Sequence, residues 1–292
     1  MEMGAPCLDC IIAQMYKVLD LAAGAADRDR IAGELKSYIS GLDISLAPPV
    51  FAKHAYRRAA ELLGITDPFR DIKRAGNDAA LALVPAAREI IASSRSPVHA
   101  ALRICAAGNT IDHGVPGRSP DPSANWLQES LSVPIDEAAL EQFSCDTERC
   151  GRILFIADNS GEIVFDRELI RVLRPGAVTC CVRGLPVQND ATRDDADQAG
   201  LSRIARVIDT GDGTPGIDLN VSSPDLLREL RAADMVLLKG QGNYETLFDA
   251  DLSGHLRAGV PLYFLLKVKC GHVAQAIGRP VGDTVLLRRM SW

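Results

Sequence analysis

The second half of the chain changes, at about residue 152, from helical patterns to short β-branched runs that alternate with helical ones. The strand-like runs include RILFIA, AVTCCVRG, RIARVID, MVLLKG and PLYFLL, and patterns such as EIVFDRELIRVL and SPDLLRELRAA separate them. This alternation is typical of βαβ units, in which parallel strands lie between layers of helices. We therefore expect an α/β fold, with a three-layer α/β/α, Rossmann-like domain around a mostly parallel sheet.

The first half has the spacing of helices. DCIIAQMYKVLDLAAGA places apolar residues at helical intervals, and Pro48 can open a later helix that Gly64 ends. Asp136 is expected to cap a further helix over EAALEQF. We expect an all-helical N-terminal subdomain over residues 1–145 and the α/β domain over 146–292, together forming one structural unit.

Composition limits the partners. With 292 residues, 47% hydrophobic and 24% charged, the chain is long and apolar enough for a sizeable core. The net charge of -6 argues against a nucleic-acid partner, which would require a basic face. No apolar run approaches the roughly 18 residues of a membrane span, and MEMGAPCLDC lacks the features of a signal peptide. We expect a cytoplasmic protein without a membrane partner, and the oligomeric state stays undecided.

Polar clusters follow three of the expected strands. In open α/β sheets, ligands bind beyond the carboxyl ends of the strands. The three clusters are DNSGE at residues 158–162, LPVQNDAT with Asn189, Asp190 and Thr192, and KGQGNYE at residues 239–245. All three should therefore lie at the ligand-binding edge of the sheet.

The residue types in these clusters suggest a metal next to a phosphate. Two carboxylates and an amide oxygen are hard ligands that suit Mg²⁺ or Mn²⁺. A lysine followed by a glycine-bearing loop at a helix start suits a phosphate group. The alternative is that Asp158, Asp190 and Asn243 merely cap the helices that follow, but three such clusters at strand ends favour a ligand site.

Other motifs fit less well. GDGTPG at residues 211–216 has the letters of the dinucleotide fingerprint, yet Pro215 lies inside it and no helix pattern follows, so we expect a turn. The sequence contains neither a G-x-x-x-x-G-K-[ST] phosphate loop nor a G-x-S-x-G elbow. An aspartyl-phosphate enzyme usually carries an acid two residues after its nucleophile, where this chain has Ser160.

The segments DNSGEIVFD, RGLPVQNDAT and KGQGNYE together resemble, in order, the three signatures of the damage-control phosphatases, a family of metal-dependent enzymes. The resemblance is closest to the prokaryotic branch, which typically begins with Cys-x-x-C, here Cys7 and Cys10. It covers nearly the whole chain, including DPFRDIKRAGNDAAL, ICAAGNTIDHG and LLKVKCGHVAQAIG. Two departures are the residue before Asn77, where serine is expected, and a longer loop at residues 114–125.

The resemblance implies a helical subdomain on an α/β/α domain, and it implies roles for the strand-end residues. It makes Asp158, Asn159 and Asp190 the ligands of a divalent metal ion, which would be Mn²⁺, Co²⁺, Ni²⁺ or Mg²⁺. It places Lys239 on the substrate phosphate and Glu162 against the substrate or a metal-bound water. Asp158, Glu162 and Lys239 would then be the catalytic residues.

Further residues are expected around the substrate. The phosphate-binding loop would consist of Gly240, Gln241, Gly242 and Asn243, and Asn189 of the second cluster would also contact the substrate or its phosphate. In AGNTIDHG, Asn109 and Asp112 form either a structural hydrogen-bonded pair or a substrate contact.

Cys7 and Cys10 have two interpretations. They are either small structural residues at a helix start or ligands of a second metal, which Cys145, Cys150 or Cys270 could complete. A thioredoxin-like role would need a preceding strand, for which the chain has no room before residue 7.

We expect a metal-dependent phosphatase that hydrolyses small phosphorylated metabolites with sugar- or nucleotide-like groups, an activity suited to metabolite damage control. One alternative is a non-catalytic protein that binds phosphometabolites. Another is an S-adenosylmethionine-dependent carboxyl methyltransferase, although its cofactor would need a glycine-rich turn where DNSGE is lined with acids. Whether water or Asp158 is the nucleophile stays open.

Overall fold

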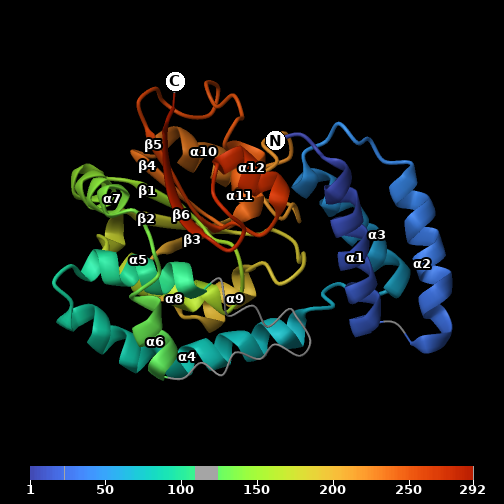
Figure 1. The fold of residues 1–292 in the computed structure, drawn as a ribbon, viewed down its shortest axis with the longest axis horizontal. Coiled ribbons are helices and arrows are strands. Elements are labelled where there is room, and N and C mark those ends of the chain that lie inside the picture. Colours follow the sequence, from blue (N-terminus) through green and yellow to red (C-terminus); the bar gives the residue numbers. More distant parts are fainter. Residues whose placement is uncertain (23, 109–123, 292) are drawn as a thin grey trace.

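The structure, a computed structural model, describes residues 1–22, 24–108 and 124–291. Its centre is a six-stranded sheet with the strand order β3-β2-β1-β4-β5-β6 (Figure 1). The strands are β1 (Ile153–Ile156), β2 (Val178–Val182), β3 (Arg206–Asp209), β4 (Met235–Lys239), β5 (Pro261–Lys267) and β6 (Thr284–Met290). The first five are parallel and β6 is antiparallel to β5. The expected mostly parallel sheet is confirmed, while the edge strand β6 was not anticipated.

Helices cover both faces of this sheet, because its strands are apolar on both sides. Ile153 and Phe155 of β1 point into one core, and Leu154 and Ile156 into the other. The first core is completed by α4 (Arg70–Ser93), α5 (Pro97–Gly108) and α8 (Glu162–Val172). The second is completed by α10 (Pro224–Ala232), α11 (Gln241–Leu247) and α12 (Gly271–Ile277). Figure 1 shows the resulting three layers, and the expected α/β/α arrangement is confirmed.

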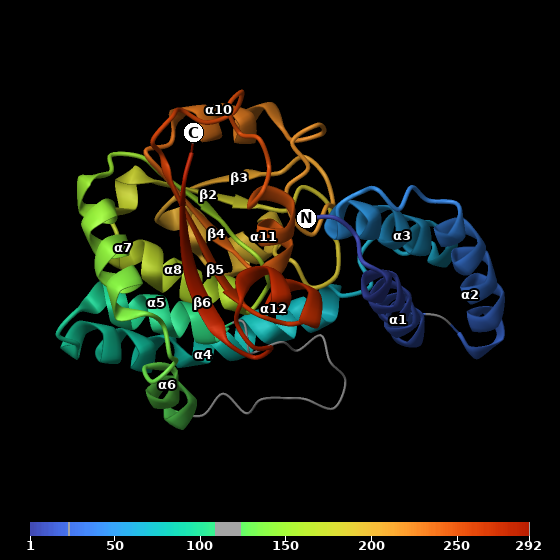
Figure 2. The same cartoon turned by 45° about the horizontal axis from the view of Figure 1, so that its top comes forward.

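Three N-terminal helices have a hydrophobic core of their own. We call α1 (Ala5–Ala22), α2 (Ala25–Ser40) and α3 (Pro48–Leu63) the helical cap; it lies to one side of the sheet domain, next to α11 and α12 (Figure 2). An ion-paired lysine joins the two parts, because Lys53 Nζ lies 3.2 Å from Asp212 Oδ2 and 2.9 Å from Asp218 Oδ2.

The remaining helices pack with the sheet. Helices α4 and α5, together with α6 (Ala124–Ser130) and α7 (Glu137–Arg149), contribute to the same core as one face of the sheet. The shorter connections are α9 (Arg193–Gln198) and the 3-10 turns η1 (Pro175–Ala177) and η2 (Leu201–Arg203). The division of the chain near residue 145 stays a prediction.

Several local signals are confirmed. Pro48 is the first residue of α3, and Gly64 ends it in the left-handed conformation with φ 64°. Asp136 caps α7, since its side chain accepts a 2.8 Å hydrogen bond from the Ala138 N–H. GDGTPG forms a turn with no helix after it. Among the described helices, none combines the length and the apolar character that crossing a membrane would require.

Candidate functional site

The three sequence clusters meet at the carboxyl edge of the sheet. In the strand order β3-β2-β1-β4-β5-β6, the chain adds β2 and β3 on one side of β1 and then returns to add β4, β5 and β6 on the other side. α/β proteins bind ligands at such a switch point, which lies here between β1 and β4. Asp158 follows β1 by two residues, and Lys239 is the last residue of β4. Asp190 follows the neighbouring strand β2. The expected convergence is therefore present in the fold.

Backbone hydrogen bonds fasten the first two clusters to each other. The Ala191 N–H donates to the Asp158 carbonyl over 2.8 Å, and the Ser160 N–H donates to the Asn189 carbonyl over 2.8 Å. Asn159 and Asp190 are paired across this contact as an antiparallel bridge. The structure thus brings Asp158, Asn159 and Asp190 together.

A buried arginine lies between the two aspartates. Arg183 follows β2 directly; its Nε donates to Asp190 Oδ2 over 2.6 Å, and its Nη2 lies 3.7 Å from Asp158 Oδ1. The side chain is about 1% exposed, and Nη2 has no hydrogen-bond partner. Arg183 was not among the residues predicted from the sequence, although its position directly after a strand was a usable signal.

Electrostatics mark this site as short of positive charge. Burial raises the pKa of Asp190 to about 6; Arg183 opposes this effect, and the nearby charge of Asp158 adds to it. Burial and the neighbouring Glu162 likewise raise the pKa of Asp158. Carboxyl groups resist ionisation when they are buried close together. A bound cation would reverse that tendency.

Lys239 lies in a second buried cluster, with Glu162 and Asp166. Its Nζ donates to Glu162 and, over 2.8 Å, to Asp166 Oδ1. Burial lowers the pKa of Lys239, but Asp166 and Glu162 outweigh it and hold the pKa well above its usual value, so the ammonium stays charged. Asp166 also accepts from the Cys105 thiol, and its Oδ2 is buried without a partner. Asp166 was missed because it stands mid-helix.

The helix-capping alternative is wrong. The N-cap residues of α8, α9 and α11 are Gly161, Thr192 and Gly240. Asn243 lies inside α11, where its amide donates to the Lys239 carbonyl over 2.6 Å and accepts from Arg183 Nη1 over 3.2 Å. None of Asp158, Asp190 and Asn243 therefore stands at a helix N-cap.

Two glycines of the third cluster are required by close packing. Gly240 has φ 82°, and a Cβ there would lie 2.0 Å from Asp158 Oδ2. A Cβ on Gly242 would lie 1.9 Å from the Pro215 carbonyl oxygen, so the GDGTPG turn packs directly on this loop. Gln241 instead donates to Glu245 and accepts from the backbone N–H of Lys269, in the connection between β5 and α12.

An asparagine from α4 supports both acidic loops. Asn77 is fully buried; its Oδ1 accepts a 2.5 Å hydrogen bond from the Gly161 N–H, and its Nδ2 donates to Asp195 Oδ1 over 3.1 Å. Asp195 in turn accepts from the backbone and hydroxyl of Thr192, just after Asp190. The family resemblance included this segment but implied no role for Asn77.

A second lysine acts on the site. The positive charge of Lys269 lowers the pKa values of Asp158, Glu162 and Asp190. Lys269 follows β5, so the strand-end rule that selected Lys239 could have found it too.

Other predicted residues stand apart. Asn109 and Asp112 lie outside the described residues. Cys7 and Cys10 lie in the first turns of α1, and burial raises the pKa of the Cys7 thiol, with its hydrogen bond to Gly4 opposing. In the described ranges, no three His, Cys, Asp or Glu side chains are arranged to hold a metal. The role of Cys7 and Cys10 as ligands of a second metal stays a prediction.

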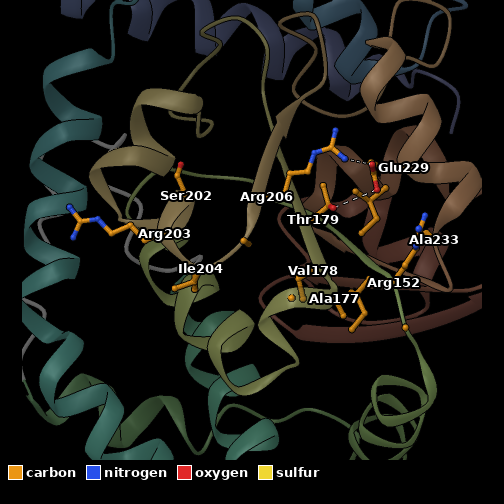
Figure 3. A pocket seen from close by; sticks show the side chains of 15 residues that line it. Arg152, Ala177, Val178, Thr179, Ser202, Arg203, Ile204, Arg206, Glu229 and Ala233 are labelled. Carbon is orange, nitrogen blue, oxygen red and sulfur yellow. Dashed lines mark hydrogen bonds and ion pairs between the residues drawn. The ribbon is translucent and has the colours of Figure 1, made fainter.

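A cavity of about 640 Å³ lies at the opposite, amino edge of the sheet (Figure 3). Its lining includes the first residues of β1, β2 and β3, and an ion pair between Arg206 Nη1 and Glu229 Oε1 at 2.5 Å. Thr179 also contacts Glu229. No residue predicted from the sequence as functional lines this cavity, so it does not mark the candidate site.

Comparison with known proteins shows the family of this chain. Residues 3–285 match the model of the damage-control phosphatase ARMT1-like domain. A damage-control phosphatase from Archaeoglobus fulgidus is 31% identical over 98% of both chains, and one from Pyrococcus horikoshii is 28% identical over 99% of this chain and 98% of its own. The crystal structure of a DUF89 family protein from Pyrococcus horikoshii superposes with a TM-score of 0.86, at 28% identity over 99% of both chains. The chain therefore belongs to the damage-control phosphatase ARMT1-like family.

Proposed function

We propose that this phosphatase-family chain hydrolyses phosphate monoesters of small metabolites with a divalent metal ion held by Asp158, Asn159 and Asp190. The observation that carries the proposal is the pair of buried aspartates at the switch point, whose pKa values are raised. Buried carboxylates are costly unless they are paired or bound to a cation. A metal ion would supply the missing charge.

The chemistry of the donor atoms fits a hard divalent cation. Asp190 Oδ2 accepts from Arg183, and Asp158 Oδ2 accepts from Asn159 Nδ2 over 2.9 Å, while Asp158 Oδ1 lies 3.7 Å from Arg183 Nη2, beyond hydrogen-bond distance. Oδ1 of each carboxylate is therefore the proposed ligand atom. Two carboxylate oxygens and one amide oxygen suit Mg²⁺, Mn²⁺, Co²⁺ or Ni²⁺. When bound, such an ion polarises a phosphoryl oxygen and orients the attacking group.

The chain itself would bind and orient the phosphate. Lys239 keeps its charge inside the fold, and Lys269 adds a second positive charge at the same edge. Gly240 leaves the space beside Asp158 free of a Cβ atom. Burial raises the pKa of Glu162, against the effect of Lys239, which suits a carboxyl group that exchanges a proton with substrate or water.

The relatives named damage-control phosphatases suggest the substrate class. We propose sugar- and nucleotide-like phosphates, including non-canonical or damaged ones.

A metal and substrate panel tests the proposal. Protein treated with a chelator should release no phosphate from p-nitrophenyl phosphate, and added Mn²⁺, Co²⁺, Ni²⁺ or Mg²⁺ should restore release. Asp158→Asn should remain inactive with every metal, whereas Asp225→Asn, in the first turn of α10 with a side chain 46% exposed, should behave as wild type. Binding of phosphometabolites without turnover under any metal would instead identify a non-catalytic binding protein.

A further inference from the structure

The loop that carries Asp190 is anchored in the helical cap. Val187, three residues earlier, is 3% exposed and belongs to the hydrophobic core formed by α1, α2 and α3. The Asp190 N–H donates to the Val187 carbonyl over 3.1 Å. The backbone position of this proposed metal ligand therefore depends on a residue buried in the cap.

Between these two residues the backbone is strained. Gln188 has φ 47°, and it is the only non-glycine residue with positive φ among residues 1–22, 24–108 and 124–291. A long side chain adopts this conformation only where its surroundings hold it, and such residues cluster at functional sites.

A hydrogen-bond junction in the cap holds Gln188. Its Nε2 donates to Gln14 Oε1 of α1 over 2.9 Å, and the same oxygen accepts from the Tyr56 hydroxyl of α3 over 2.8 Å. Tyr56 is 8% exposed, so the junction is largely dry. One amide oxygen thereby joins two cap helices to the strained turn.

We propose that Gln14 and Gln188 are positioning residues that hold Asp190 in place for the metal ion. The inference rests on the proposed function. The Ser160 N–H donates to the Asn189 carbonyl over 2.8 Å, so the position of the turn is also passed to the loop that carries Asn159. Neither glutamine is among the proposed metal ligands, yet both would fix the separation of those ligands.

The direct test is Mn²⁺ binding measured by calorimetry on the full chain, well below its unfolding temperature. Gln14→Leu and Gln188→Ala should each raise the Kd for Mn²⁺ about tenfold, the lower end of the roughly ten- to hundredfold loss in metal affinity that removal of a supporting group typically causes. The double variant should bind no more weakly than either single one. Lys17→Met, on the exposed side of α1, should match wild type.

A milder pair of variants guards against misfolding. Tyr56→Phe removes one of the two hydrogen bonds to Gln14 and should weaken Mn²⁺ binding by a smaller factor. Gln188→Asn tolerates positive φ but cannot reach Gln14, and should resemble Gln188→Ala. Unchanged Mn²⁺ affinity in these folded variants would overturn the inference alone. A wild-type protein that binds no divalent ion would overturn the proposed function and this inference with it.

Discussion

The two edges of one sheet differ in how they treat charge. At the carboxyl edge six charged side chains are at most 7% exposed: Asp158, Glu162, Asp166, Arg183, Asp190 and Lys239. At the amino edge, which has the cavity, the pair Arg206–Glu229 has side chains 50% and 15% exposed. Cavity volume and buried charge therefore point to opposite edges, and buried charge agrees with the strand-end rule.

The buried charged groups make the carboxyl edge of the sheet less stable than an apolar edge would be. Burying ionised groups is expensive, and replacing them by apolar residues often stabilises a protein. Six buried charged groups at one edge of a sheet indicate a role in function rather than in stability, since departures from the usual burial preferences occur mainly at functional sites. At the amino edge, the polar groups reach solvent, as they do on most protein surfaces.

The largest effect is expected from the two aspartates. Asp158→Asn or Asp190→Asn should lower metal-stimulated phosphatase activity by more than about a hundredfold, because even supporting residues of metal sites contribute about ten- to a hundredfold. The circular dichroism spectrum should be retained. Wild-type kcat/KM in either variant would show that the buried charges serve no metal.

Lys239 should matter for stability as well as activity. Lys239→Met leaves Glu162 and Asp166 buried without their shared ammonium, so the free energy of unfolding should fall by about 3–5 kcal/mol. Urea unfolding measures the change, with Lys17→Met as the exposed control. A loss below about 1 kcal/mol, the usual value for an exposed pair, would mean that these carboxyls are already neutral.

The pH dependence of metal binding should follow Asp190. Its pKa is raised to about 6, and the proton must leave before the carboxylate can bind a cation. Mn²⁺ affinity should therefore fall about tenfold per pH unit below pH 6 and level off above about pH 7. Calorimetry between pH 5 and 8 measures this, and a constant Kd across that range would contradict the assignment.

The smallest effect is expected at the amino edge. Glu229→Gln removes the partner of Arg206 but leaves no buried charge without a partner, so the free energy of unfolding should change by about 1 kcal/mol or less. Metal-stimulated activity should equal that of wild type. A clear loss of activity would show that the cavity has a role in turnover.

The sequence was sufficient where function follows from the order of elements. Asp158, Asp190 and Lys239 could be selected because each stands at the end of a recognisable strand. The parallel sheet and its two helical layers followed from the same alternation. Strand β6 was missed because it is an edge strand in which only Val285 and Leu286 are buried, so its apolar signal is weak.

The remaining residues depend on tertiary contacts that no local pattern contains. Asn77 reaches the site from α4, eighty-four residues before the Gly161 N–H to which it binds. Gln14 reaches Gln188 across 174 residues. Asp166 carries no signal within its helix. Arg183 and Lys269 do follow strands, and a stricter use of the strand-end rule would have included them.

The most direct measurement is anomalous diffraction from crystals soaked in Mn²⁺. We expect one strong peak bounded by the side-chain oxygens of Asp158, Asn159 and Asp190, each about 2.1 Å away. The peak should be absent in Asp190→Asn crystals grown and soaked in the same way. A saturated peak elsewhere, such as at Cys7 and Cys10, with none between the two aspartates would contradict the proposed metal site.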